Sequence, residues 1–151
     1  SVTMVGKFLK GAIEAPQTRG GMDDTVVETV DRLVAAYEAA MEKFAFHRAL
    51  QSIFEITALL NKYIDAEAPW RLAKEGDGRL STVLYNIWNS LRIVGLLLYP
   101  FMPGKAEALW RGLGIGRPLA EASFAAERPF YLPSDLAVID KMKPLFPRIE
   151  T

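Results

Sequence analysis

The sequence predicts an all-α fold: a helical bundle of about five helices with a Pro-rich C-terminal tail packed across it. Over several long stretches, apolar side chains recur at spacings of three and four residues, the period of one helical face. No stretch alternates apolar and polar residues between hairpin turns, and no internal repeat is found. Half of the 151 residues are hydrophobic, which suffices for one core, so we expect a single domain over residues 1–151.

The first predicted elements are a helix, a loop and a second helix. Residues 1–9 place apolar side chains on a helical stripe with no N-cap before them, so we expect the chain to begin inside a helix of a longer polypeptide. Glycines and a proline in 11–22 predict a loop. Thr25 and Glu28 have the spacing of a capping box, which predicts the start of a helix over about 24–42.

Three more helices follow. The apolar period predicts one over about 45–66, then a Gly-containing turn at 75–79 and a long helix through 83–98. Prolines end that helix, and a shorter one follows over about 104–113. The expected core stripe of the helix over 45–66 consists of Phe46, Ala49, Leu50, Ile53, Thr57, Leu60 and Ile64.

The pattern loosens after Gly114. Prolines and a glycine interrupt the rest of the chain, although Ser134 could cap a short helix over 134–141. Such a tail cannot form a long element of its own, so we expect it to lie across the bundle.

Composition excludes several classes of protein. Eighteen Lys and Arg balance eighteen Asp and Glu, so no global positive field attracts the chain to DNA or to RNA phosphates non-specifically. The chain has no cysteine, and its single histidine, His47, cannot form a metal cluster alone. His47 is therefore interpreted as a surface or capping residue. No secretory signal is present, and the apolar run 93–102 is half the ~20 residues that span a membrane. We therefore expect a cytoplasmic protein without a membrane partner.

The segment 61–70, reading NKYIDAEAPW, is the strongest candidate for a site. Pro69 biases Ala68 away from the helical region and suits the first turn of a new helix, which places Trp70 at a bend with a fixed direction. An exposed aromatic ring held in this way can stack on an unpaired base. From the residues alone, packing against a neighbouring helix is the more common role of such a tryptophan.

Three ordered motifs resemble one family. Segment 61–70 is similar to a motif with an Asn-Lys/Arg-Tyr start and an Ala-Pro-Trp end in the anticodon-binding domain of methionyl-tRNA synthetases, which are class I aminoacyl-tRNA synthetases. Further on, LRI at 91–93, LLYPFMP at 97–103 and LG at 113–114 resemble the family's next helix and its exit, and PLFPRI at 144–149 resembles the closing phrase.

The resemblance implies roles for five residues. Trp70 matches the tryptophan that stacks on an anticodon base, and Pro69 matches the residue that sets its geometry. Asn61 could read a base edge, or alternatively cap or brace the bundle. Arg71 and Lys74 follow Trp70 and could contact the flanking phosphates.

Other polar and aromatic residues have simpler interpretations. Trp88 and Trp110 fall on apolar stripes and are expected in the core. Asp65 and Glu67 are interpreted as surface charges, or as partners of the cations that follow Trp70.

The family's catalytic signatures are absent from these 151 residues. There is no His-Ile-Gly-His-like tetrapeptide, and the segment KMKP at 141–144 only partly resembles a Lys-Met-Ser-Lys-Ser loop. The resemblance therefore implies that an upstream catalytic domain of the parent enzyme binds ATP, Mg and methionine, while this chain holds no cofactor and binds methionine tRNA through its CAU anticodon. The family's other contacts, an asparagine and an arginine four residues apart, are expected just before Ser1.

Two alternatives stay open. One is the equivalent domain of another class I synthetase, for leucine, isoleucine, valine or cysteine. The other is a helical protein-interaction module that binds no RNA. An accessible Trp70 flanked by cations would favour RNA, whereas an uncovered strip of Leu and Val would favour a protein partner.

Overall fold

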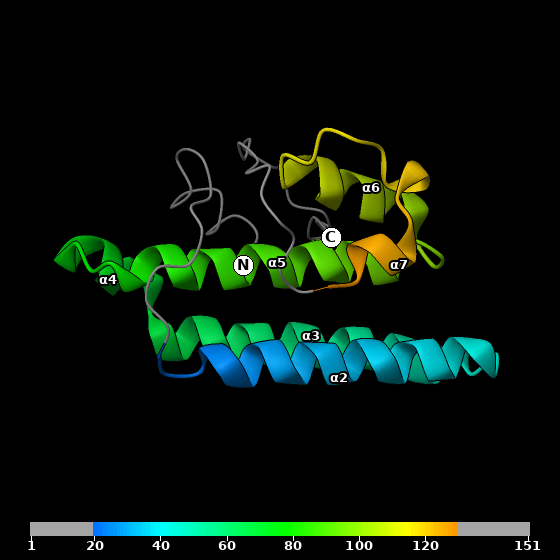
Figure 1. Ribbon diagram of the computed structural model, residues 1–151, viewed down its shortest axis with the longest axis horizontal. Helices are drawn as coiled ribbons and strands as arrows, with labels where there is room; N and C mark the ends of the chain where they lie inside the picture. The colour runs from blue at the N-terminus through cyan, green and yellow to red at the C-terminus, as the bar shows by residue number, and fades with distance from the viewer. Residues whose placement is uncertain (1–19, 130–151) are drawn as a thin grey trace, which may run out of the picture.

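The computed structural model describes residues 20–129, and these residues form helices and connecting turns without a strand. The predicted all-α bundle is confirmed. Figure 1 shows α2 and α3 side by side, with α5 running over them and α6 on the opposite side of α5. The elements are α2 Asp23–Glu42, α3 Phe46–Glu67, α4 Pro69–Glu75, α5 Arg79–Leu98, α6 Pro103–Gly112, the 3-10 helix η1 Leu119–Glu121 and α7 Phe124–Glu127.

Helix α5 is the centre of the bundle. It packs against α2 and α3 on one side and α6 on the other, so nearly its whole surface is buried. Trp88 and Trp110 are both in the core, as predicted. Each indole nitrogen donates a hydrogen bond to a carbonyl, Trp88 to Leu113 at 3.0 Å and Trp110 to Arg117 at 3.1 Å. The bundle therefore buries these rings with their one polar atom satisfied.

The bounds of the four helices predicted between residues 24 and 113 agree with the structure to within a few residues, but the predicted capping box is wrong. Helix α2 starts at Asp23 with Met22 as its N-cap, and no side chain caps it. The reason is that the helix begins before Thr25, so Thr25 and Glu28 lie inside it. The Asp23 carboxylate instead accepts a hydrogen bond from the Gly20 N–H at 2.9 Å.

The predicted core stripe of α3 is correct only in part. Phe46 is 49% exposed and Thr57 is exposed, while Ile56 and Tyr63 are completely buried. Helix α3 packs against both α2 and α5, so its buried face is wider than one stripe and is rotated towards Ile56 and Tyr63. The Thr57 hydroxyl donates a hydrogen bond to the Ile53 carbonyl of its own helix, at 3.0 Å.

The described part of the tail crosses the bundle as predicted. Phe124 of α7 stacks on Tyr37 of α2, with ring centroids 6.3 Å apart. The buried guanidinium of Arg92 donates hydrogen bonds to the carbonyls of Glu127 at 2.5 Å and Pro129 at 2.6 Å. A side chain of the central helix thereby helps to hold the end of the described tail in place.

Several predictions lie outside the described residues. These are the helical start in 1–9, most of the loop at 11–22, the short helix over 134–141 and the phrase at 144–149. Within residues 20–129, none of the helices combines the length and apolar character that crossing a bilayer requires.

Candidate nucleic-acid interface

The bend between α3 and α4 is formed by Ala68. Its φ of 45° and ψ of 65° lie in the left-handed region, where residues other than glycine are uncommon. The Ala68 N–H closes α3 by donating to the Ile64 carbonyl at 3.0 Å, and its own carbonyl accepts from the Arg71 N–H at 2.8 Å. Pro69 is the first residue of α4, as predicted. One residue thus ends the first helix and starts the second.

The seven residues of α4 divide into buried and exposed positions. Pro69 and Leu72 are buried and attach the helix to the bundle, mainly against α5. Trp70 is 40% exposed, and Arg71 and Lys74 are exposed on the same short helix. Figure 1 shows α4 at one end of the molecule. The predicted exposure of the indole, with cations beside it, is therefore confirmed, whereas contact of these residues with RNA stays a prediction.

Asn61 lies on α3, two turns before the bend, and is exposed. Among residues 20–129, its side-chain amide has no hydrogen-bonding partner that would brace the bundle. The amide is therefore accessible to a ligand, although its role in reading a base stays a prediction. Asp65 is exposed, as expected of a surface charge.

Glu67 differs from the expectation for this segment. The sequence predicts a surface charge or a partner of Arg71 and Lys74, and this prediction is wrong. Its side chain is only 12% exposed, and Oε2 lies 2.5 Å from Nη2 of Arg79, the first residue of α5. Glu67 Oε1 also accepts a hydrogen bond from the Met22 N–H at 3.3 Å. The charge of Glu67 is therefore used inside the fold, because the bend brings the end of α3 next to the start of α5.

Glu67 and Arg79 belong to a larger set of polar contacts beneath the bend, which we call the junction network. Arg79 Nη1 lies 3.3 Å from Oδ2 of Asp23, the buried first residue of α2. Asp23 Oδ1 accepts hydrogen bonds from the Tyr63 hydroxyl at 2.5 Å and the Asn86 amide at 3.3 Å. Burial, helped by the hydrogen bond to Asp23, raises the pKa of Tyr63, so this phenol stays a donor. The network consists of Asp23, Tyr63, Glu67, Arg79 and Asn86.

The motifs of the sequence do not predict the junction network. Tyr63 belongs to the Asn-Lys-Tyr motif, but Asp23 directly follows the predicted loop at 11–22 and Arg79 ends the predicted turn at 75–79. The one available signal was the occurrence of charged residues beside glycines, at 20–23 and 76–79, on both sides of the motif. Sequence separation hides their contact, because Asp23 and Arg79 are 56 residues apart.

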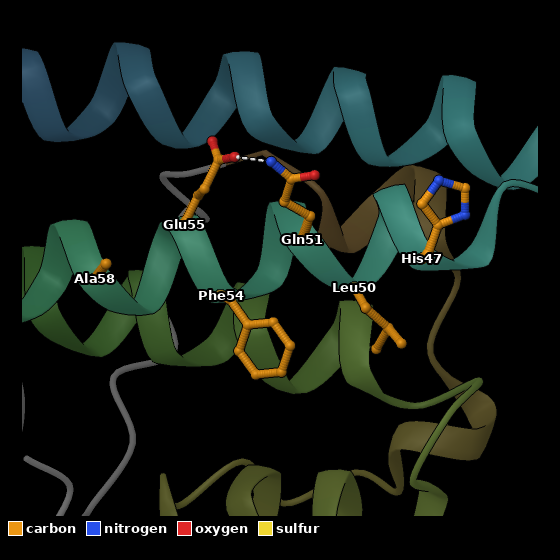
Figure 2. A pocket seen from close by; sticks show the side chains of 6 residues that line it. All are labelled: His47, Leu50, Gln51, Phe54, Glu55 and Ala58. Atoms are coloured by element: carbon orange, nitrogen blue, oxygen red, sulfur yellow. Dashed lines mark hydrogen bonds between the residues drawn. The ribbon is translucent and has the colours of Figure 1, made fainter.

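A second exposed surface lies on the outward face of α3. Figure 2 shows an open hollow in which Phe54 and Leu50 point to the same side, and Phe54 is 69% exposed. His47 also lines the hollow and is exposed, as expected. The large exposed apolar side chains of residues 20–129 are aromatic or methionine, and the uncovered strip of Leu and Val that would favour a protein-interaction module is not among them. No group of acidic or histidine side chains in these residues could hold a metal ion.

The fold and this site define a helical domain that presents an exposed indole and cations to a ligand. Residues 23–145 match the family model described as the anticodon-binding domain of tRNA ligase, so the chain belongs to that family. The resemblance identified in the sequence is thereby confirmed.

The similar proteins agree with one another. The chain is 35% identical to the methionine–tRNA ligase of Caldanaerobacter subterraneus subsp. tengcongensis and 36% identical to that of Lactococcus lactis, in each case over 99% of this chain. It spans only 23% and 22% of those proteins. Among solved structures, Mycobacterium tuberculosis methionyl-tRNA synthetase bound by methionyl-adenylate superposes with a TM-score of 0.81, at 28% identity over 97% of this chain and 29% of that chain.

Proposed function

We propose that this chain recognises the CAU anticodon of methionine tRNA, as the anticodon-binding domain of a methionine–tRNA ligase. The observation that carries the proposal is that Trp70 is 40% exposed and directly follows Pro69, which is buried. Membership of the anticodon-binding family and similarity to methionine–tRNA ligases over 99% of the chain support this tRNA over those of other class I synthetases.

The side chains around the bend suit recognition of a few unpaired bases. Trp70 stacks on an anticodon base, which contributes about 1–3 kcal/mol, and Pro69 sets the direction of the ring. Asn61 offers an amide to a base edge, and Arg71 and Lys74 contact neighbouring phosphates. Because the net charge of the chain is zero, affinity comes from stacking and local contacts and not from a general positive field.

We assign the attachment of methionine to tRNA to the longer protein. A catalytic domain elsewhere in the same polypeptide binds ATP, Mg and methionine and charges the tRNA, while residues 1–151 act as one domain that holds the anticodon. We place this enzyme in the cytoplasm, with tRNA as its nucleic-acid partner and with neither DNA nor a membrane as a ligand.

The test compares two exposed aromatic residues. Labelled CAU stem-loop RNA is titrated with the 151-residue chain, with Trp70→Ala and with the matched control Phe54→Ala, whose ring is 69% exposed on α3. We expect Trp70→Ala to raise Kd by about 5- to 150-fold, the equivalent of one stacking contact, and Phe54→Ala to leave it unchanged. A stem-loop with a different first anticodon base should bind more weakly.

Two results would contradict the proposal. If Trp70→Ala binds as the unchanged chain does, Trp70 is not the stacking platform. If a stem-loop with a leucine, isoleucine, valine or cysteine anticodon binds more tightly than CAU, the parent enzyme is a different synthetase.

A further inference from the structure

We propose that Arg79 is a positioning residue for anticodon recognition: it ties together the two ends of the segment that carries Trp70 and so holds the indole in its binding orientation. The inference rests on the proposed function, since it concerns the same site. The proposal gives Arg79 no contact with the RNA. Arg79 acts through its ion pair with Glu67, which holds the bend at Ala68.

The ion pair of Glu67 and Arg79 joins the two ends of the segment that carries Trp70. Glu67 is the last residue of α3 and Arg79 is the first residue of α5, so the whole of α4 lies between them. Their side chains meet at 2.5 Å although they are 12 residues apart. Helix α4 itself packs mainly against α5 and has little contact with α3. Helix α3 also packs on α5, and the Asn86 amide donates to the Tyr63 hydroxyl at 3.0 Å. The ion pair adds to these contacts at the last residue of α3, where it fixes the α3 side of the bend relative to the helix on which α4 rests.

The bend between α3 and α4 needs a constraint from the surrounding structure. Ala68, the residue after Glu67, is in the left-handed region, which is unfavourable for alanine by roughly 1–2 kcal/mol. Such a conformation persists only where its surroundings hold it. Pro69 and Leu72 hold the α4 side by burial, and the contact of Glu67 with Arg79 holds the other side.

The backbone before α2 lies close to both side chains of the ion pair. A Cβ atom on Gly20 would lie 2.7 Å from Arg79 Nη1, and one on Gly21 would lie 2.5 Å from Glu67 Oε1. The two glycines therefore allow the chain before α2 to approach both side chains, whose exposed fractions are 20% for Arg79 and 12% for Glu67. Partial exclusion of water makes this pair stronger than a typical surface salt bridge.

A second arginine pair provides the matched control. Arg128 and Glu38 meet at 2.8 Å, with side-chain exposures of 40% and 32%, and they join the end of the described tail to α2. Loss of this pair removes an arginine contact of similar type without touching either end of α4.

The experiment uses the 151-residue chain with 5-fluorotryptophan and compares Arg79→Met with Arg128→Met. The fluorine resonance of Trp70 is assigned by its loss in Trp70→Phe, because Trp88 and Trp110 are needed in the core. Without RNA, we expect Arg79→Met to shift or broaden the Trp70 line and leave the other two lines in place. The Kd for the CAU stem-loop should rise about fivefold or more, because the platform is no longer preorganised. Arg128→Met should change neither readout.

A gentler pair of variants covers the case in which Arg79→Met does not fold. Glu67→Gln removes the charge but keeps an oxygen for the Met22 N–H, and Glu38→Gln is its control. We expect the fluorine line of Trp70 and the Kd for the CAU stem-loop to change in Glu67→Gln and to stay the same in Glu38→Gln. The inference is overturned if a folded Arg79→Met or Glu67→Gln chain keeps the Trp70 line and Kd of the unchanged chain.

The two proposals can fail separately. The fluorine readout needs no RNA, so it tests the positioning role of Arg79 even if the unchanged chain fails to bind the CAU stem-loop. That failure would overturn the proposed function alone.

Discussion

The hydroxyl of Tyr63 donates a hydrogen bond to the carboxylate of Asp23 at 2.5 Å, which joins the last turns of α3 to the first residue of α2. Asp23 is 1% exposed, so its buried carboxylate needs hydrogen-bonding partners in the protein. Besides Tyr63 these are the Gly20 N–H, the Asn86 amide and the Arg79 guanidinium. Because both carboxylate oxygens accept hydrogen bonds, a charged group at the junction can be buried without an unsatisfied atom.

We expect Tyr63→Phe to destabilise the domain by about 1.5–3 kcal/mol, since a buried carboxylate loses a hydrogen bond. The control is Tyr37→Phe, which removes a buried hydrogen bond of 2.8 Å to the uncharged Leu97 carbonyl and should lower stability by only about 1 kcal/mol. Urea unfolding followed by circular dichroism measures both changes. Equal losses in the two variants would mean that the charge of Asp23 adds nothing to this contact.

Glycine at position 68 should cost little stability, although glycine usually destabilises a helical segment. Ala68→Gly removes left-handed strain of roughly 1–2 kcal/mol, while the greater freedom of the unfolded chain and the lost methyl group act in the opposite direction by a similar amount. Its unfolding free energy should therefore stay within about 1 kcal/mol of the unchanged chain.

Ala66→Gly is the control for this expectation. Ala66 is exposed in the last turn of α3 and carries no such strain, so glycine there should be destabilising by about 1 kcal/mol. Thermal and urea unfolding compare the two variants. A larger loss in Ala68→Gly than in Ala66→Gly would show that Ala68 is not strained.

Gly95 of α5 faces α6 and is a site where alanine should stabilise the protein. A Cβ atom there would lie 3.6 Å from Leu109 Cδ2 and 3.7 Å from Trp110 Cε3, which are ordinary contact distances. Gly95→Ala should therefore raise the unfolding free energy by about 0.5–1 kcal/mol, because glycine is unfavourable within a helix. Gly76, with a φ of 65°, is the opposite case, and Gly76→Ala should lower stability. A loss of stability in Gly95→Ala would indicate that α5 and α6 pack too tightly for a methyl group.

Stability should fall at alkaline pH because of Tyr37. Burial raises the pKa of Tyr37 from 10.0 to about 12, so between these values the unfolded chain releases a proton that the folded chain keeps. The contribution of Tyr37 is therefore complete below pH 10 and is lost as pH rises towards 12, with a slope of at most about 1.4 kcal/mol per pH unit. Urea unfolding at several pH values, with Tyr37→Phe as reference, isolates this slope from every other titrating group. Parallel curves for the two chains would refute the assignment.

The sequence by itself determined the helices and the exposed bend. The apolar period predicts where α2, α3, α5 and α6 lie because each helix depends mainly on residues three or four positions apart. The start of α4 follows from another local rule, the preference of proline for the first position of a helix. The left-handed conformation of Ala68 does not follow from that rule. The buried and exposed residues of α4 then leave Trp70 accessible, as the motif predicted.

The contacts that hold the bend at Ala68 are seen only in the tertiary structure. The rotated face of α3, the partner of Glu67 and the role of Arg79 all depend on how α2, α3 and α5 meet. These contacts join residues 12 to 63 positions apart, for which no local period or propensity gives a signal. A charged residue looks the same in sequence whether it is solvated or paired in the interior, and packing alone distinguishes the two.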